Sequence, residues 1–422
     1  MDDATKSSVR RPPLPHTRGA AWADGATLLG DLRGASRLAI DAVTGVTGIV
    51  EEMHRNIAAA SPVVGTAPTG SARGISGFVY RAVRGVARGV GLGIDLALAP
   101  LPGLLAGAGA SSPRREAILA AANGIWGQHL VETGNPLAIP MNLRRDGRPL
   151  QLDAGPLAAE FGAAPGRLLI LVHGLCMNDL QWCRDGHDHG IELARDLGCI
   201  PLYLHYNSGR HISVNGRELA HVLERLLRAW PGRVEELAIL GHSMGGLVAR
   251  SACHYAHAAG YAWPGRLRHL AFLGTPHHGA PLERAGNWAD ILVGLSPYTV
   301  PFARLGKARS AGIKDLRRGS LLDEDWRGRP GDDAGDPRTP VPLPAGVCCY
   351  AVAATRNAPR GGRRRDGDGL VPVDSALGRH ADPARCLPIP PDRQLVVEGI
   401  DHFGLLASRQ VCDRLRNWFA RP

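Results

Sequence analysis

Six short runs of apolar residues, spread over the last two thirds of the chain, constrain its fold more than any other feature. They occupy residues 167–174, 199–206, 236–243, 267–274, 347–355 and 393–400. Most are followed by a segment with helical periodicity, such as residues 216–230 or 246–259. Strands that are apolar throughout and alternate with helices are typical of a parallel sheet covered on both faces. We therefore predict an α/β fold whose mostly parallel sheet is flanked by helices.

The segment before these runs predicts a sheet edge. Residues 137–152 read as two short strands around Asp146-Gly147, a dipeptide that favours a hairpin turn. We place the α/β domain at residues 137–422. Between about residues 280 and 346 the alternation lapses in a long stretch rich in proline and arginine. Long insertions without regular structure are often functional, so we predict a lid or cap over the site.

The first part of the chain predicts a separate helical region. Residues 1–20 lack the apolar run of a secretory signal, and we expect a disordered arm there. Residues 21–136 predict helices, with one apolar stripe from Leu32 to Ile57 and a second from Val79 to Ile94. These stripes are expected to pack on each other or on the next domain. Because the second helix carries arginines on its other face, the alternative is a basic amphipathic helix lying on a membrane.

Composition limits the partners and the compartment. Lys and Arg number 49 against 39 Asp and Glu, a formal net charge of +10 that permits contact with an anionic membrane surface. Aromatic residues make up only 5% and do not interleave with basic ones as in single-strand binders, so we expect no nucleic-acid partner. Residues 89–110 could span a bilayer by length, but Asp95, Pro100 and Pro102 interrupt them, which favours a buried helix end followed by a loop.

Eight scattered cysteines and the lack of an export signal predict reduced thiols. We therefore expect a cytoplasmic protein, with peripheral membrane contact through the basic N-terminal helices as an open alternative. The oligomeric state stays open.

The residues GHSMGG at 241–246 follow an apolar run and precede a helical segment. This is the context of a G-x-S-x-G nucleophile elbow, in which a serine lies on a sharp strand-to-helix turn. Gly241 and Gly245 permit such a turn because they lack side chains. Ser243 would then project its hydroxyl from the carboxyl edge of the sheet, and it is the candidate nucleophile.

A serine nucleophile needs a base, and the base needs a carboxylate that orients it. His402 follows the last apolar run and precedes the terminal helical segment, the position expected of the base in this chain order. The loop after residues 347–355 offers Asp366, Asp368 and Asp374. We favour Asp368, which directly precedes Gly-Leu-Val, with Asp366 as the alternative. Asp374 is expected to be a helix N-cap or a loop carboxylate.

An oxyanion hole needs backbone N–H groups aimed at the developing negative charge. We expect one from Met244, directly after the nucleophile, and another from Leu175, in the loop after the first apolar run. His173 closes that run. It is expected to brace the loop beside the substrate rather than act as a base.

Together these motifs resemble the α/β-hydrolase lipases and esterases, most closely the bacterial lipase-like and GPI inositol-deacylase-like branches. The motifs are LVHGL (171–175), YNSGRHIS (206–213), GHSMGG (241–246), LGTPHHGAP (273–281), DGLVPVDSA (368–376) and DHFGLL (401–406). The resemblance covers about residues 140–422 and implies an α/β-hydrolase fold.

By this resemblance, Ser243, Asp368 and His402 form a catalytic triad. Leu175 and Met244 form the oxyanion hole, and His277 lies at the rim as a structural or substrate-facing residue. No metal or organic cofactor is implied.

The expected activity is that of a serine carboxylic-ester hydrolase acting on lipophilic esters through an acyl-enzyme. Apolar residues in the insertion favour an acyl chain, unless they are simply core: Trp288, Ile291, Leu292, Val293, Leu295, Tyr298 and Phe302. The same triad also supports thioesterase, amidase, acyltransferase or polyester depolymerase chemistry. A membrane- or lipid-binding protein with a vestigial hydrolase fold is the alternative from another class.

Overall fold

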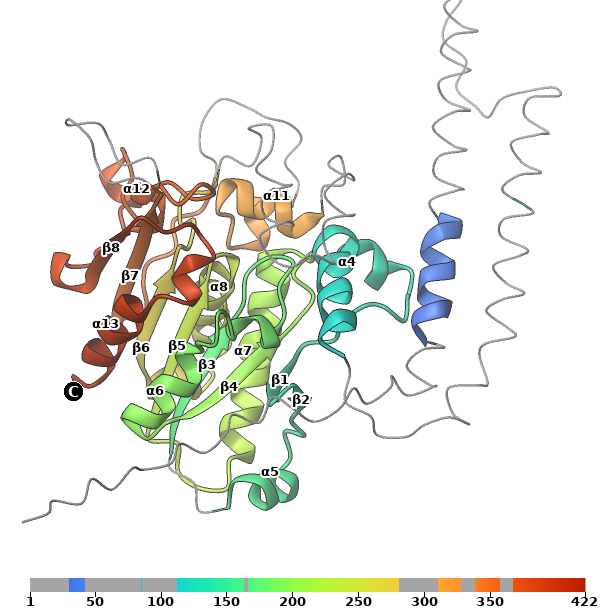
Figure 1. Cartoon of the computed structure of the whole chain (residues 1–422), viewed down its shortest axis with the longest axis horizontal. Coiled ribbons are helices and arrows are strands. Elements are labelled where there is room, and N and C mark those ends of the chain that lie inside the picture. Colours follow the sequence, from blue (N-terminus) through green and yellow to red (C-terminus); the bar gives the residue numbers. More distant parts are fainter. Residues whose placement is uncertain are drawn as a thin grey trace, which may run out of the picture.

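A computed structural model of the chain describes residues 30–41, 85, 112–162, 166–280, 310–327, 338–356 and 367–421. Its centre is one eight-stranded sheet (Figure 1). The strands are β1 (Asn142–Arg145), β2 (Arg148–Pro149), β3 (Arg167–Val172), β4 (Ile200–His205), β5 (Glu236–His242), β6 (Leu267–Leu273), β7 (Cys348–Thr355) and β8 (Gln394–Glu398). Their order across the sheet is β2-β1-β4-β3-β5-β6-β7-β8.

The sequence prediction of the strands is confirmed. Each of the six apolar runs forms one strand, from β3 to β8, and these six pair in parallel. The hairpin is confirmed as well, because β1 and β2 pair antiparallel and β1 adds antiparallel to β4. Asp146 and Gly147 take φ values of 51° and 73°, the left-handed pair that a two-residue hairpin turn requires.

Helices cover both faces of the sheet. α6 (His189–Leu197) and α13 (Arg409–Phe419) pack together on one face, and α7 (Ile212–Ala229) and α8 (Met244–Ala258) pack together on the other (Figure 1). α5 (Ala154–Phe161) lies against α7. The central strands are buried almost throughout because both of their faces are covered. The mostly parallel sheet between helical layers, with this strand order, is the α/β-hydrolase fold.

Shorter elements complete the described chain. They are α11 (Ala311–Arg318), α12 (Val373–Ala376) and the 3-10 turns η1 (Asp179–Trp182), η2 (Trp263–Arg266), η3 (Asp323–Asp325), η4 (Pro383–Arg385), η5 (Pro391–Arg393) and η6 (Gly404–Leu406). α11 and η3 belong to the 280–346 insertion. The apolar residues from Trp288 to Phe302, which the sequence offers as candidates for the lid, lie outside the described residues.

The strand order has one switch point, between β3 and β5. From β3 the chain moves to β4 on one side, and it later returns to β5 on the other side. In open α/β sheets, ligands bind outside the carboxyl ends of the strands at such a point. Val172 and Gly241, next to those ends, are paired neighbours. The loop that begins at His173 and the turn at Ser243 therefore meet there.

The helix α4 (Pro113–Glu132) is built against the α/β domain. Its N-cap is Ser112, whose side chain accepts from the Arg115 amide, and proline follows at the first turn. A Cβ on Gly124 would lie 2.2 Å from Sγ of Cys176, so no side chain fits at this crossing. Ala121 and Ile125 belong to the same hydrophobic core as the central strands.

A further helix, residues 30–41, lies beside α4. Its Asp31 carboxylate receives two bonds from the Arg115 guanidinium, at 2.5 and 2.8 Å, and the Gly34 carbonyl accepts from Asn135. Leu32, which begins the predicted first stripe, is 52% exposed. This helix therefore contacts α4 through Asp31, and the segment after α4 through Gly34, rather than through Leu32.

The other predictions for the first third of the chain fall outside the described residues. They concern residues 1–20, the stripe from Val79 to Ile94 and residues 89–110. The division of the chain at residue 136 also stays a prediction. Among the helices that the structure describes, none combines the length and the apolarity needed to cross a membrane.

Candidate active site

Ser243 lies on a strained turn between β5 and α8. Its φ and ψ are 55° and −125°, a conformation that residues with side chains rarely adopt. Neighbouring glycines make the turn possible, because a Cβ on Gly245 would lie 2.1 Å from the Val172 carbonyl oxygen and one on Gly241 would lie 2.6 Å from Cα of Gly246. The backbone thus has the shape of a nucleophile elbow.

The loop after β3 lies directly against Ser243. A Cβ on Gly174 would approach Cβ of Ser243 to 3.0 Å. The loop is held in place at Cys176, two residues after Gly174, because the amide of Cys176 donates to Oγ of Ser208 at 3.0 Å. Within the described residues, the amides of Leu175 and Met244 donate to no protein acceptor. Both predicted oxyanion donors are therefore available on the two segments that meet at the switch point.

His402 and Asp368 are brought together. Nδ1 of His402 lies 2.7 Å from Oδ2 of Asp368, and both side chains are buried. The other carboxylate oxygen, Oδ1, accepts from the amides of Leu370 and Val371 at 2.9 and 2.8 Å. These bonds fix the carboxylate so that it orients the imidazole ring.

The neighbouring carboxylates have other surroundings. Asp366 lies outside the described residues. Asp374 is in the first turn of α12, whose N-cap is Pro372, and it lies 3.9 Å from the Arg379 guanidinium. The expectation that Asp374 is a helix N-cap or a loop carboxylate is therefore wrong, because α12 begins at Val373 and Asp374 is its second residue.

His242, which sequence reasoning did not assign to the site, holds the backbone of His402. Its Nε2 donates to the His402 carbonyl at 3.2 Å, and the two rings lie 4.8 Å apart. Burial, and then the positive charge that His402 can carry, hold the pKa of His242 well below its ordinary value. His242 is thus a neutral donor that positions the loop of His402. The only signal for it in the sequence is its place as the variable residue of the G-x-S-x-G motif.

A small apolar pocket joins Ser243 and His402. Its volume is about 20 Å³. Its lining residues are Gly174, Leu175, Met177, His242, Ser243, Pro276, Ala280, Leu316, Leu370, Val371, His402 and Phe403. Pockets for drug-sized ligands usually hold roughly 300–1,000 Å³, so this one is closed to all but the smallest molecules.

The helix α11, from the inserted segment, supplies part of this pocket through Leu316. Asp315, the residue before it, is buried and ties α11 to the start of α7. Its Oδ2 accepts from the Ile212 amide at 2.8 Å and lies 3.0 Å from Nδ1 of His211. The His211 ring stacks on Trp326 with centroids 3.7 Å apart. The described part of the insertion is therefore held next to the pocket by the contacts of Asp315 and Trp326 with the start of α7.

The two other predicted histidines do not line this pocket. His173 is fully buried, its Nδ1 donates to the Gly174 carbonyl at 2.8 Å, and its ring stacks on Tyr206. Burial lowers the pKa of His173 to about 3, so it is neutral and braces the loop. His277 lines a separate pocket beside Arg250. Substrate contact by either histidine stays a prediction.

Two clusters in the described part of the chain bring three metal-ligating side chains together. In the first, Glu116 and Asp179 lie with His205, but the Arg144 guanidinium already bonds both carboxylates, at 2.9 and 3.1 Å. The second cluster consists of His187, His189 and Cys412. There the two histidines bond each other at 2.9 Å, and burial raises the pKa of the thiol to about 11. The contacts present within each cluster therefore explain it without an ion.

The strand order and the strained serine turn after β5 define the class: this is an α/β-hydrolase fold with a nucleophile elbow. A family model described as "Domain of unknown function (DUF7379)" matches residues 148–312. No curated protein matches the chain.

Several solved structures are similar. A lipase of Bacillus licheniformis in its mature form is 19% identical, with 57% of this chain and 86% of that chain covered and a TM-score of 0.38. An ester-hydrolase from the metagenome of Lake Arreo is 18% identical, with 61% and 74% covered and a TM-score of 0.36. An esterase of Pyrococcus furiosus is 13% identical, with 61% and 83% covered and a TM-score of 0.35.

Proposed function

We propose that this chain is a serine carboxylic-ester hydrolase with Ser243 as nucleophile, His402 as base and Asp368 as the carboxylate that orients the base. One observation carries the proposal: a serine held at positive φ shares a pocket with a histidine whose other side is bonded to a buried carboxylate. A serine, a base and an orienting group in this relation are the requirement for an activated nucleophile.

The mechanism follows from these positions. Nε2 of His402 takes the hydroxyl proton as Oγ of Ser243 attacks the ester carbonyl carbon. The carbonyl oxygen becomes an oxyanion and accepts from the amides of Leu175 and Met244. The ester C–O bond then breaks, and the alcohol leaves with the proton from His402. Water, deprotonated by His402, attacks the acyl-enzyme and releases the acid and the free serine by the same route.

The pocket supports a lipophilic acyl group. Apolar side chains, among them Met177, Leu316 and Phe403, surround Ser243. Because the closed pocket is smaller than an acyl chain, binding requires a movement of these side chains or of α11. We also propose that the chain is closer to the bacterial lipase-like or GPI inositol-deacylase-like branch than to other hydrolases. Its basic N-terminal helices would make peripheral contact with a membrane.

The test is the hydrolysis of p-nitrophenyl esters of increasing acyl length by the whole chain and by Ser243→Ala. We expect activity that the substitution abolishes, with an optimum set by the acyl pocket. Ser251→Ala is the matched control. It also removes the hydroxyl of a buried serine, but this serine lies on α8 away from the pocket.

A fluorophosphonate probe separates the remaining outcomes. Labelling of the wild type but not of Ser243→Ala, without ester hydrolysis, would support Ser243 as the nucleophile. The substrate would then be a thioester, an amide or a polyester, or the acyl group would pass to an acceptor other than water. Absence of both labelling and hydrolysis would overturn the proposal and favour a binding protein with a vestigial hydrolase fold.

A further inference from the structure

The cluster of His187, His189 and Cys412 lies where three segments of the chain meet. His187 ends the hairpin turn of residues 184–187, His189 begins α6, and Cys412 is in the first turn of α13. One ring nitrogen of each histidine and Sγ of Cys412 all lie within 4.8 Å of one another. The residues that line the Ser243 pocket include none of the three, so the cluster is separate from the candidate active site.

His189 is held in the tautomer that a metal ligand needs. Its Nε2 donates to the Leu405 carbonyl at 2.8 Å, so the ring proton is on Nε2 and Nδ1 carries a lone pair. Burial lowers the pKa of His189 to about 4, so the ring is neutral at pH 7. Metal-binding histidines almost always donate their second nitrogen to a carbonyl, a carboxylate or water in this way.

The contact between the two histidines is one that an ion can replace. In the metal-free chain, Nδ1 of His189 accepts from Nε2 of His187 at 2.9 Å, which accounts for the closeness of the two rings. When the His187 proton moves to Nδ1 of its ring, two lone pairs face the same point beside Cys412. Zinc holds nitrogen at roughly 2.0–2.1 Å and sulfur at about 2.3 Å, so its tetrahedral ligand atoms lie roughly 3.3–3.6 Å apart. A small rotation of the half-buried His187 side chain gives the two nitrogens that spacing.

The charges around the cluster also favour a cation. Burial lowers the pKa of His187 and raises that of Cys412, and the Glu192 carboxylate is the next influence on both. Two arginines of α13 act on these pKa values in the opposite sense to Glu192, Arg409 on His187 and Arg416 on Cys412, but each acts more weakly than Glu192. The nearest charge common to both side chains is therefore negative.

We propose that His187, His189 and Cys412 bind one Zn²⁺ ion, with water in the fourth position. Two imidazoles and one thiolate suit zinc, a borderline-soft ion that takes nitrogen and sulfur ligands. Binding forms two zinc–nitrogen bonds and one zinc–sulfur bond, and the proton of the thiol is released to solvent. Zinc undergoes no redox change, so the step needs no other reactant.

The ion would stabilise the loop that carries His402. His189 donates to Leu405, three residues after His402. At the start of the hairpin turn, the Arg184 guanidinium lies 5.3 Å from the centroid of the Phe403 ring. An ion that ties this turn to α6 and α13 therefore fixes two neighbours of the loop. Its role is structural, because the cluster does not reach the Ser243 pocket.

Cobalt(II) binds to zinc sites and has a visible spectrum, so it can test this site in the whole chain after a chelator has removed bound metals. We expect saturable binding of a single Co²⁺ with a near-ultraviolet sulfur-to-cobalt charge-transfer band, which Zn²⁺ should abolish by displacement. Isothermal titration calorimetry with Zn²⁺, in buffers of different ionisation enthalpy, should show the release of about one proton from the thiol.

Two substitutions remove one ligand each. Cys412→Ser should abolish the charge-transfer band. Cys412→Ser and His187→Gln should both weaken Zn²⁺ binding by more than the roughly 10–100-fold that the loss of an outer-shell partner costs.

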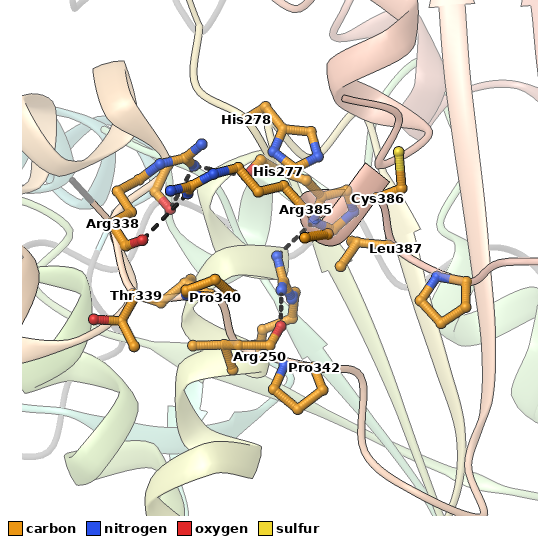
Figure 2. A pocket seen from close by; sticks show the side chains of 15 residues that line it. Arg250, His277, His278, Arg338, Thr339, Pro340, Pro342, Arg385, Cys386 and Leu387 are labelled. Carbon is orange, nitrogen blue, oxygen red and sulfur yellow. Dashed lines mark hydrogen bonds between the residues drawn. The ribbon is translucent and has the colours of Figure 1, made fainter. Parts of the chain in front are cut away.

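Cys386→Ser is the matched control. Cys386 is also a thiol near histidines, because it lines the separate pocket that contains His277 and His278 (Figure 2). Within the described part of the chain, however, it belongs to no cluster of three ligands. The variant should keep both the band and the affinity of the wild type.

If Cys412→Ser fails to fold, His187→Gln carries the test, because His187 is half-buried on a hairpin turn. Absence of saturable binding of either ion would overturn the proposal, as would unchanged affinity in the two ligand variants. Binding without a charge-transfer band would overturn the assignment to Cys412, and so would loss of the band in Cys386→Ser. Because ester hydrolysis is not used as a readout, these outcomes are independent of the proposed function.

Discussion

Nδ1 of His402 lies 2.7 Å from Oδ2 of Asp368, and the other oxygen of that carboxylate is held by two backbone amides. The carboxylate therefore has a fixed direction before any substrate binds. A histidine bonded in this way carries its proton on Nδ1 and leaves Nε2 free to accept one. The orientation of the His402 ring is therefore set by the folded chain itself.

Asp368→Asn tests that orientation. An amide can present its NH₂ group to His402 and favour the wrong tautomer, so we expect kcat for the best p-nitrophenyl ester to fall by about 10⁴, the cost of the same change in a chymotrypsin-type triad. Asp374→Asn, in the first turn of α12 and partly exposed, should keep its activity. Activity that survives Asp368→Asn would transfer the orienting role to another carboxylate, with Asp366 the first to test.

Gly174→Ala should damage the site more than the fold. The added Cβ would lie 3.0 Å from Cβ of Ser243 and 3.3 Å from Nδ1 of His242, so the loop that carries the Leu175 amide must shift. Loss of one oxyanion donor costs roughly 10²–10³ in kcat, which is the expected range here. Thermal melting should change little.

Gly265→Ala is the control for Gly174→Ala, because its Cβ would meet nothing within 4 Å. Equal activity of the two variants would contradict the placement of the oxyanion loop against Ser243.

Acid should destabilise the fold through its buried neutral histidines. Burial lowers the pKa of His173 to about 3 and that of His189 to about 4. Below the ordinary histidine pKa of about 6.5, the unfolded chain binds protons that the folded chain does not. The unfolding free energy therefore falls as the pH falls from about 6.5 towards 4, by up to about 1.4 kcal/mol per pH unit for each such histidine.

Urea midpoints at several values between about pH 7 and pH 5 measure this loss. His189→Gln keeps an N–H donor for the Leu405 carbonyl, which now accepts from Nε2 at 2.8 Å, but does not titrate. Its midpoint should depend less steeply on pH. A wild-type midpoint that stays constant or rises on acidification would show that these histidines are not buried and neutral.

Asp315→Ala should loosen α11 over the pocket of Ser243. It removes the acceptor of the Ile212 amide and the partner of His211, a loss of roughly 1–3 kcal/mol for buried donors left unpaired. Hydrogen exchange should quicken in residues 311–318, and KM should change more than kcat because Leu316 lines the pocket. Glu324→Ala removes an exposed carboxylate from the same insertion and is the control. Unchanged exchange in Asp315→Ala would show that this anchor is not needed.

The sheet could be predicted from the sequence because its signal is local. Each strand is a continuous apolar run, and Asp146-Gly147 specifies the hairpin through its own backbone preferences. Ser243 and His402 could be proposed for the site for a similar reason, since each follows a strand that periodicity identifies. Asp368 was the favoured member of three carboxylates, and its bond to His402 depends on a loop path that spacing does not define.

Other features depend on contacts between distant segments and left no such signal. His242 donates to a carbonyl 160 residues away, and Arg250 on α8 lines a pocket with two arginines from other segments, Arg338 and Arg385. In the sequence, Asp315 does not differ from other carboxylates on helices. Its role depends on its contact with the start of α7. In each case, the role of the residue depends on its burial and on the direction in which its side chain points, and neither can be read from the sequence.

The contact between α4 and the loop after β3 determines where this chain can be shortened. Gly124 touches Cys176, and the Gly124 carbonyl accepts from Oγ of Ser310, so α4 braces both the loop after β3 and the start of α11 in the insertion. A shortened chain that begins at residue 137, just before the first strands, would lose this brace and expose the apolar underside of the loop. The smallest part of the chain that folds with an intact Ser243 pocket should therefore begin before Ser112.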